Sequence, residues 1–236
     1  GAGSVNVISR SIESYIKGDG TLVKTIATGN GMGVVLNSKD NSLILASAGV
    51  LSAAVGVGET SGVGGSMGAS VIVNVVNNTT DSHISGAKVV SAKEVDLDAE
   101  SNATIWALAI AGSLGVGVGN SATGVGVAVS GAATINVVTN NTYSYINQSQ
   151  ITTPANGAVS LDAKDHTLIL ADAGGVSVAV GGGKSAGVGV ALGGSVAVNV
   201  VTNKTLAYIS ASTIGTALKP VGAVSLNTTS DAKIWA

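Results

Sequence analysis

The segment Thr134–Ile146, TINVVTNNTYSYI, is the strongest evidence for the fold because the chain carries three further copies of it. The copies are SVNVISRSIESYI from Ser4, IVNVVNNTTDSHI from Ile72 and AVNVVTNKTLAYI from Ala197. Self-similarity at an interval of tens of residues indicates an array of stacked units, each of which buries its apolar face against its neighbours. The sequence therefore predicts a repeat protein.

Two columns of side chains mark each copy. Anchor asparagines recur 68, 62 and 63 residues apart, and an aromatic or histidine side chain follows each of them nine residues later. Stacked asparagines can hydrogen-bond from one unit to the next, or each can satisfy the backbone of a turn; the sequence leaves both open. The aromatic column favours packing over the end of a core, with a binding stripe as the alternative. The columns are Asn6, Asn74, Asn136 and Asn199, and Tyr15, His83, Tyr145 and Tyr208.

A second anchor, the leucine at positions 36, 97, 161 and 226, separates a constant part of the unit from a variable one. The interval from this leucine to the next asparagine is 38, 39 and 38 residues, whereas the other interval varies from 23 to 30. Insertions in a repeat array map to loops on one face. The variable connections are Lys17–Met32, Gly86–Glu94, Asn147–Gly157 and Ser210–Gly222.

Period-two alternation of apolar and polar residues predicts strands throughout, with turns at Asn140-Asn141, Gly119–Thr123 and Gly183–Ser185. The fold class is therefore all-β, a repetitive β-solenoid (parallel β-helix). The alternative is an extended two-layer array of antiparallel strands. Three coils of about 21 residues in each unit would give roughly eleven coils and a rod on the order of 50 Å. In Gly187–Val190 the valines take one face and the glycines the other, so a neighbouring sheet can approach the glycine face closely.

Composition excludes several classes of protein. The 236 residues include 34 Gly, no Phe and no Cys, and the net charge of −2 provides no basic patch for nucleic acid. The longest uncharged apolar stretch, Ile105–Gly119, is shorter than the roughly 20 residues of a spanning helix, so we expect no membrane span in this segment. We expect a single array of about three and a half units, 1–67, 68–130, 131–193 and 194–236, cut from a longer protein.

One weak metal candidate stands out. Glu94, Asp96, Asp98 and Glu100 alternate on a predicted strand, so their carboxylates share one face and could hold a hard cation such as calcium. Because the other units lack an acidic residue at the position of Asp96, a solvated outer face is the favoured interpretation.

Other motifs point to structure rather than catalysis. Gly183-Lys184-Ser185 has Val178 where a phosphate loop needs glycine, which favours a turn. The two histidines, His83 and His166, have no catalytic partner repeated between units. We therefore predict no enzyme, no catalytic residues and no cofactor. Three N-x-T triplets at Asn78, Asn140 and Asn203 are predicted turn residues, with glycosylation as the alternative.

The copies GASVIVNVVNNTTDSHI, GAATINVVTNNTYSYI and GGSVAVNVVTNKTLAYI, each followed by a VSLDA-like strand and a GVGVA stretch, resemble a known class of repeat. They are similar to the β-strand repeats of giant bacterial surface proteins, the leukotoxin-like and filamentous-haemagglutinin-like adhesins exported by type V secretion. The resemblance covers essentially the whole chain. It implies an extracellular β-helical rod on the bacterial cell surface that carries a binding or toxin region outward.

The expected function is a structural stalk or filament segment of a surface or secreted adhesin, mediating adhesion or cell–cell contact. One alternative is a carbohydrate- or protein-binding module that recognises a host or partner-cell surface through the variable loops. A second is end-to-end self-association into fibres through uncapped strands. A polysaccharide-processing solenoid would need an acidic groove, for which only the Glu94–Glu100 group qualifies.

Overall fold

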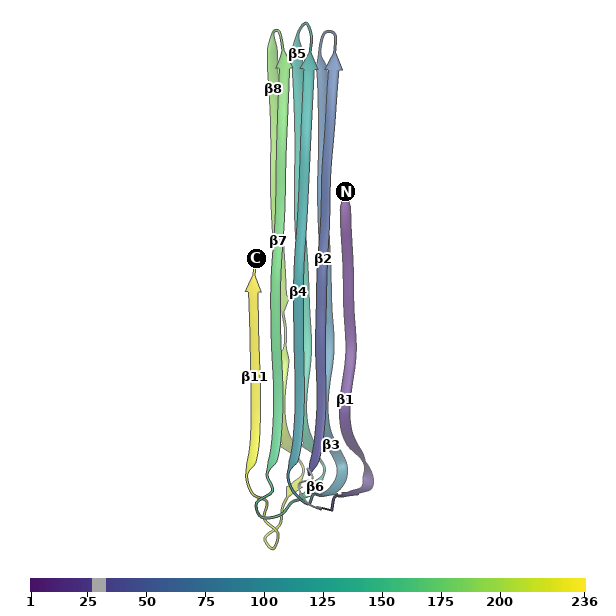
Figure 1. Ribbon diagram of the computed structural model, residues 1–236, viewed down its shortest axis with the longest axis vertical. Coiled ribbons are helices and arrows are strands. Elements are labelled where there is room, and N and C mark those ends of the chain that lie inside the picture. Colours follow the sequence, from purple (N-terminus) through teal and green to yellow (C-terminus); the bar gives the residue numbers. More distant parts are fainter. Residues whose placement is uncertain (27–32) are drawn as a thin grey trace.

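A computed structural model describes residues 1–26 and 33–236 and shows an all-β chain folded into two layers. Long strands of up to 29 residues run the length of the molecule (Figure 1). Alternation along each strand sends one side chain inward and the next outward, as the period-two pattern predicts. The strands are β1 Ala2–Lys24, β2 Val34–Gly58, β3 Gly62–Val90, β4 Val95–Gly119, β5 Thr123–Asn147, β6 Gln150–Thr152, β7 Val159–Gly183, β8 Ala186–Val201, β9 Lys204–Ser210, β10 Thr213–Ile214 and β11 Val224–Trp235.

Every hydrogen-bonded pair of these strands is parallel. Sheet A joins β1 to β3, β3 to β5, and β5 to β8 and β9, with the short β6 and β10 continuing it at one end. Sheet B has the order β2, β4, β7, β11 from one edge to the other. The chain runs along one layer and returns along the other, so strands run in opposite directions only between the two layers (Figure 1). The parallel solenoid is confirmed, and antiparallel pairing within a sheet is wrong.

The size of a coil differs from the prediction. Each unit of about 63 residues forms one coil with one long strand in each sheet, rather than three coils of about 21. The predicted turn at Asn140-Asn141 lies inside the continuous strand β5, whereas the predicted turns at Gly119–Thr123 and Gly183–Ser185 do connect strands. With a rise of about 3.3 Å per residue and about 4.8 Å between strands, the molecule is roughly 80 Å long along its strands and only about 15–20 Å deep along the stack. The predicted rod of stacked short coils is therefore wrong.

The anchor asparagines form a ladder inside the molecule. Their register is exact from β1 through β3 and β5 to β8. The Nδ2 of Asn6 donates to Oδ1 of Asn74 at 2.8 Å, Asn74 donates to Asn136 at 2.7 Å, and Asn136 donates to Asn199 at 2.8 Å. The coil-to-coil interpretation is confirmed, and the turn interpretation is wrong.

The loop-side half of the molecule, nearest the variable connections, has an aliphatic interior. Its inward side chains come from both sheets and are almost fully buried. Burial of large aliphatic side chains stabilises a fold by roughly 1.5–3 kcal/mol each. This cluster contains Ile84, Val89, Val95, Leu97, Ile146, Ile151, Val159 and Leu161.

The turn-side half, which in the central coil runs from Gly112 through the turn to Gly131, is built in the opposite way. Its innermost positions near the turn are glycines, and a Cβ at Gly117 would lie 2.0 Å from the Val125 carbonyl oxygen. The two backbones are therefore in direct contact, which confirms the predicted close approach over a glycine face. The alternate positions carry valines that point outward into solvent.

Candidate functional site

The described parts of the variable connections all lie at one end of the molecule (Figure 1). Sheet A strands end there and sheet B strands begin there, because each connection carries the chain from one sheet to the other. The sequence does not reveal this grouping, since it follows from one coil per unit. The first connection, Lys17–Met32, lies partly outside the described residues, because residues 27–32 are not described. This loop end is the best candidate for a binding surface.

The connections are held in register by backbone hydrogen bonds. Ser91 N donates to Thr152 O at 2.8 Å, Val95 N to Ala158 O at 2.9 Å, and Gly222 N to Gly157 O at 2.9 Å. Each connection is therefore hydrogen-bonded to the next one, as the strands are. This pairing fixes the backbone of a surface that would otherwise lose much conformational entropy on binding a ligand.

Each strand of sheet A bends before it reaches the loop end. The equivalent residues Gly86, Gln148 and Ala211 have positive φ angles of 66°, 48° and 48°. Gln148 and Ala211 adopt this left-handed conformation although they carry a Cβ, at a cost on the order of 1 kcal/mol each. The bend recurs in successive coils, so it gives the connections a common direction.

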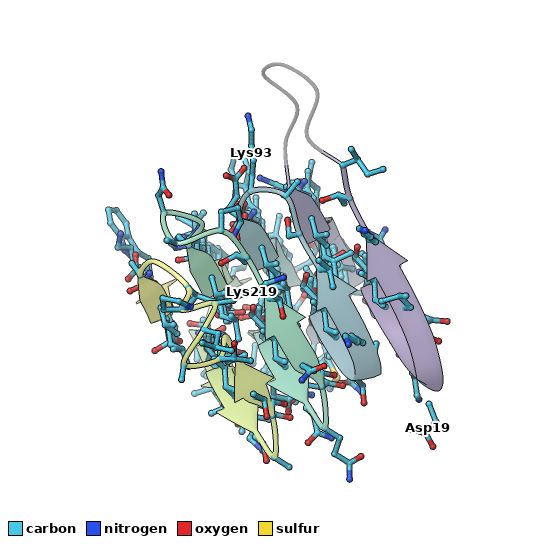
Figure 2. The ribbon with its side chains drawn as sticks, turned by 90° about the horizontal axis from the view of Figure 1, so that it is seen from below. Asp19, Lys93 and Lys219 are labelled. Atoms are coloured by element: carbon cyan, nitrogen blue, oxygen red, sulfur yellow. The ribbon has the colours of Figure 1, made fainter. Side chains whose placement is uncertain are left out.

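Two shallow hollows flank Pro154 at the loop end. The first is lined by parts of three connections, and the second lies on the other side of the proline, nearer to Glu94. Lys93 stands on the second connection and Lys219 on the fourth, with Asp19 at the opposite side of this end (Figure 2). The linings are Val90, Ser91, Thr152, Thr153, Pro154, Ala155, Leu218, Lys219 and Pro220, and Ala92, Lys93, Glu94, Pro154, Asn156 and Gly157.

The chemistry of the loop end suits recognition by hydrogen bonding. Several hydroxyls there are already used internally, since Thr153 Oγ1 donates to Gly157 O at 2.8 Å and Ser91 Oγ to Glu94 O at 2.8 Å. The Lys93 and Lys219 ammonium groups and the exposed side chain of Leu218 remain available on the surface. Such a mixture of cations, amide and apolar surface can contact a glycan or a peptide.

The four acidic residues singled out from the sequence are placed on sheet B. Asp96, Asp98 and Glu100 point outward from β4, and Glu94 precedes that strand. Lysines on the neighbouring strands accompany two of them: Lys164 Nζ lies 3.2 Å from Asp98 Oδ1, and Lys39 Nζ lies 2.8 Å from Glu100 Oε1. The carboxylates are thus spread along an outer face, and Asp98 and Glu100 form ion pairs across the strands.

The electrostatics of this group differ from one carboxylate to the next. Burial, followed by the charges of Asp162, Asp98 and Glu94, raises the pKa of Asp96. The hydrogen bond from Lys39 lowers the pKa of Glu100. Among the residues that the structure describes, no group of three or more His, Cys, Asp or Glu side chains could hold a metal ion. For Glu94–Glu100 the solvated outer face stays the favoured prediction, with a calcium site as the alternative.

The phosphate-loop-like triplet and His166 occupy structural positions. Lys184 and Ser185 form the short connection between β7 and β8, and Ser185 N donates to Ala122 O at 3.1 Å in the preceding turn. His166 lies in register with Asn41 and Asn102 on the outer face of sheet B. It sits within the long strand β7.

Two of the three N-x-T triplets are not turns, whereas Asn203 lies in the break between β8 and β9. Asn78 and Asn140 lie within strands with their side chains buried between the sheets. Asn78 Nδ2 donates to Asp40 Oδ2 at 2.6 Å, and Asn140 Nδ2 donates to Asp165 Oδ2 at 3.1 Å. A glycan cannot be attached to these amides in the folded chain, because they are enclosed.

The aromatic column forms a continuous stack. Ring centroids are 5.2 Å apart between Tyr15 and His83, 4.7 Å between His83 and Tyr145, and 5.0 Å between Tyr145 and Tyr208. The rings lie on the outer face of sheet A, since they alternate with inward residues such as Ile84 and Ile146. Packing over the end of the core is therefore wrong, and the rings instead pack on one another.

This stacking limits what the column can bind. Both ring faces of His83 and Tyr145 are covered by neighbours, so sugar rings cannot stack on them. His83 Nδ1 lies 3.1 Å from Asp81 Oδ1. Burial and the nearby Asp81 charge raise the pKa of Tyr145 to about 12, so its hydroxyl stays protonated at neutral pH.

Sequence reasoning missed a buried polar belt between the sheets. Asp40 and Asp165 are fully buried and stand in one row of sheet B with Ser101 between them. Arg10 Nη1 lies 3.2 Å from Asp40 Oδ1, whereas Asp165 accepts hydrogen bonds from the neutral groups of Asn140, Asn203 and Thr167. The signal was available in the sequence, because Asp165 has the same strand parity as the inward Leu161.

Comparison with known proteins adds no relative. No family model matches the chain, and no curated protein or solved structure matches it. Among the described residues, no helix is long and apolar enough to cross a membrane.

Proposed function

We propose that the chain is a structural segment of the stalk or filament of a bacterial cell-surface or secreted adhesin. The observation that carries the proposal is the in-register asparagine ladder, which links every coil to the next across the whole stack. In such an array each coil is stabilised mainly by its neighbours, so coils can be added without redesign of the unit. The likeness of the repeats to those of giant surface adhesins supports the same role.

The dimensions define what kind of filament this would be. Each coil of about 63 residues adds only about 4.8 Å along the stack, while its strands extend roughly 80 Å across it. The array therefore grows as a broad slab, and it needs about three times as many residues per unit length as a rod of 21-residue coils. Wide faces are the surface that such a filament offers to its surroundings.

Removal of one coil in register tests the structural role. Deletion of residues 69–130 joins Gly68 to Gly131, which preserves the strand register because Gly68 pairs with Ser130. We expect the shortened chain to fold with the same β circular dichroism per residue. A control deletion of 69–129 shifts β3 by one residue, exchanges its inward and outward side chains and should prevent folding. Equal behaviour of the two deletions would contradict the repeat-based structural proposal.

The loop end favours one second candidate, a binding module for a glycan or protein of a host or partner cell. The hydrogen-bonded connections and the two hollows around Pro154 are the observation behind it. Beads coated with the chain would be tested for retention on host-cell layers. A spacer gives no retention, whereas a binding module gives retention that Lys93→Ala combined with Lys219→Ala reduces and that Lys39→Ala, on the outer face of sheet B, leaves unchanged.

A further inference from the structure

The outer face of sheet A carries an apolar band that covers the turn-side half and continues a few residues beyond it. The band covers the outward residues of β3 from Val63 to Val75 and their partners on β5 and β8, with β1 joining beside Val71. No Asp, Glu, Lys or Arg stands on these stretches. Many of the side chains are strongly exposed, among them Met67 at 73% and Leu192 at 62%. Contiguous apolar patches of several hundred Å² mark interaction surfaces in soluble proteins.

The surface of the band is uneven, with a ridge and a groove that both run across the strands. Met67, Val129 and Leu192 are aligned in register and form a ridge. Two residues further along, the small residues Ala69, Gly131 and Gly194 are aligned in the same way and floor a shallow groove. The ridge and the groove are parallel, equally long and about 7 Å apart.

From this relief we propose that the sheet A face docks a second copy of this chain, face to face. A two-fold axis that lies in the interface, parallel to the ridge and midway between ridge and groove, places the ridge of each copy in the groove of the other. The same axis, at the level of Gly68, maps the band from Val63 to Val75 almost onto itself. Such a self-complementary patch is what a two-fold dimer requires.

The size of the band fits a stable dimer. Twelve residues of strand at about 3.3 Å and three to four strands at about 4.8 Å give roughly 600–750 Å² per copy. Specific interfaces bury about 800 Å² per partner. Strands of the two copies run in opposite directions, so the charged loop-side halves point away from each other at the two ends.

A lipid surface fits less well than a second copy. The exposed carboxylate of Asp172 lies on the sheet B face, four residues before the turn-side half begins at Val176, so insertion of the whole band into a bilayer would bury a charge. The sheet A band also lacks the basic residues that draw a protein onto anionic lipid headgroups. Only the sheet A face is free of charge along the whole band.

Sedimentation equilibrium of the chain tests the proposal with a matched pair of variants. Leu192→Glu places a charge on the ridge, and Val176→Glu places one on the sheet B face at a similar distance from the same turn, with 66% exposure against 62%. We expect association that stops at the dimer, a dissociation constant raised at least tenfold by Leu192→Glu, and a change below twofold for Val176→Glu. Circular dichroism checks that both variants are folded.

A second pair tests the groove without adding charge. A Cβ at Gly131 would meet no atom nearer than Gly194 O at 4.0 Å, so Gly131→Leu fits the chain but fills the groove. It should weaken the dimer although it adds apolar surface, whereas Gly174→Leu on sheet B should not. The proposal would be overturned if the chain is a monomer at all concentrations or if the two variants of a pair have equal effects. It would also be overturned by open-ended growth that Leu192→Glu does not change, or by flotation with phosphatidylcholine vesicles in place of a dimer.

Discussion

The loop-side and turn-side halves share the same strands but bury opposite kinds of residue. In the loop-side half, Leu97 and Ile146 fill the space between the sheets, and polar or charged residues face solvent. In the turn-side half, glycines such as Gly117 let the backbones touch, and valines face outward. The difference shows that period-two alternation defines which residues share a face, whereas the side-chain volume on the inner face sets the spacing between the sheets.

The largest loss of stability is expected from a substitution that breaks the close contact between the two sheets in the turn-side half. Gly117→Val would place a Cβ 2.0 Å from the Val125 carbonyl oxygen, so the sheets must separate along this half. We expect a loss of more than about 4 kcal/mol, which is the range of exceptional substitutions. Thermal unfolding and amide hydrogen exchange would measure it. Gly182→Val, at an outward position with nothing within 4 Å of its Cβ, is the control and should be nearly neutral.

A smaller effect is expected from a cavity in the loop-side half. Leu97 is fully buried, so Leu97→Ala should cost about 2–5 kcal/mol of unfolding free energy. Val118→Ala, which truncates a 36% exposed valine of the turn-side half, should cost less than about 1 kcal/mol. Urea unfolding of both variants measures the contrast. Similar losses would mean that the outward valines contribute to the fold as much as the inner core does.

The asparagine ladder, which lies inside the molecule between these two kinds of interior, should give an intermediate effect. Asn136→Ala removes two ladder hydrogen bonds and leaves the Nδ2 of Asn74 and the Oδ1 of Asn199 without their ladder partner. Unsatisfied buried polar groups cost about 1–3 kcal/mol, and we expect a loss in this range by urea unfolding. The exposed Asn77 lies on the outer face, and Asn77→Ala should be neutral; a neutral Asn136→Ala would contradict the structural role of the ladder.

The smallest effect concerns the polar belt of the loop-side half. Burial raises the pKa of Asp165 above its ordinary value of 3.8. The native carboxyl therefore binds its proton at a higher pH than the unfolded chain does, so its contribution to stability increases as the pH falls from neutral through the native pKa and is constant below 3.8. Asp165→Asn should remove this part of the pH dependence and leave stability at pH 7 equal or slightly higher.

Unfolding free energies between pH 7 and about pH 4 would test this linkage. Asp231→Asn, at an exposed position on β11, is the matched control and should keep the pH dependence of the parent chain. If Asp165→Asn and the parent show the same slope, the buried carboxyl does not titrate in this range and the expected linkage is absent.

Some parts of the candidate site could be predicted from the sequence and others could not. Constant and variable intervals located the four connections, because insertions are tolerated only where the backbone leaves the sheets. The hollows around Pro154 could not be predicted, since they form between connections that are distant in sequence. The carboxylates of Asp96 and Asp98 were placed correctly on one face, but their neighbours across the strands, such as Lys164, depend on register between coils.

The amino-acid sequence was sufficient to predict that the chain is all-β, that asparagine and aromatic residues recur at equivalent positions of the units, and that length varies in one connection per unit. These properties depend on local alternation and on spacing between copies, which are one-dimensional. That the two columns stack, and that one unit makes one coil, became visible only in the folded chain, because the choice between one long and three short coils depends on how far the two sheets stay in contact. Glycine on the inner face keeps that contact unbroken to the turn, so each strand continues for about 25 residues and the valines are left on the outside.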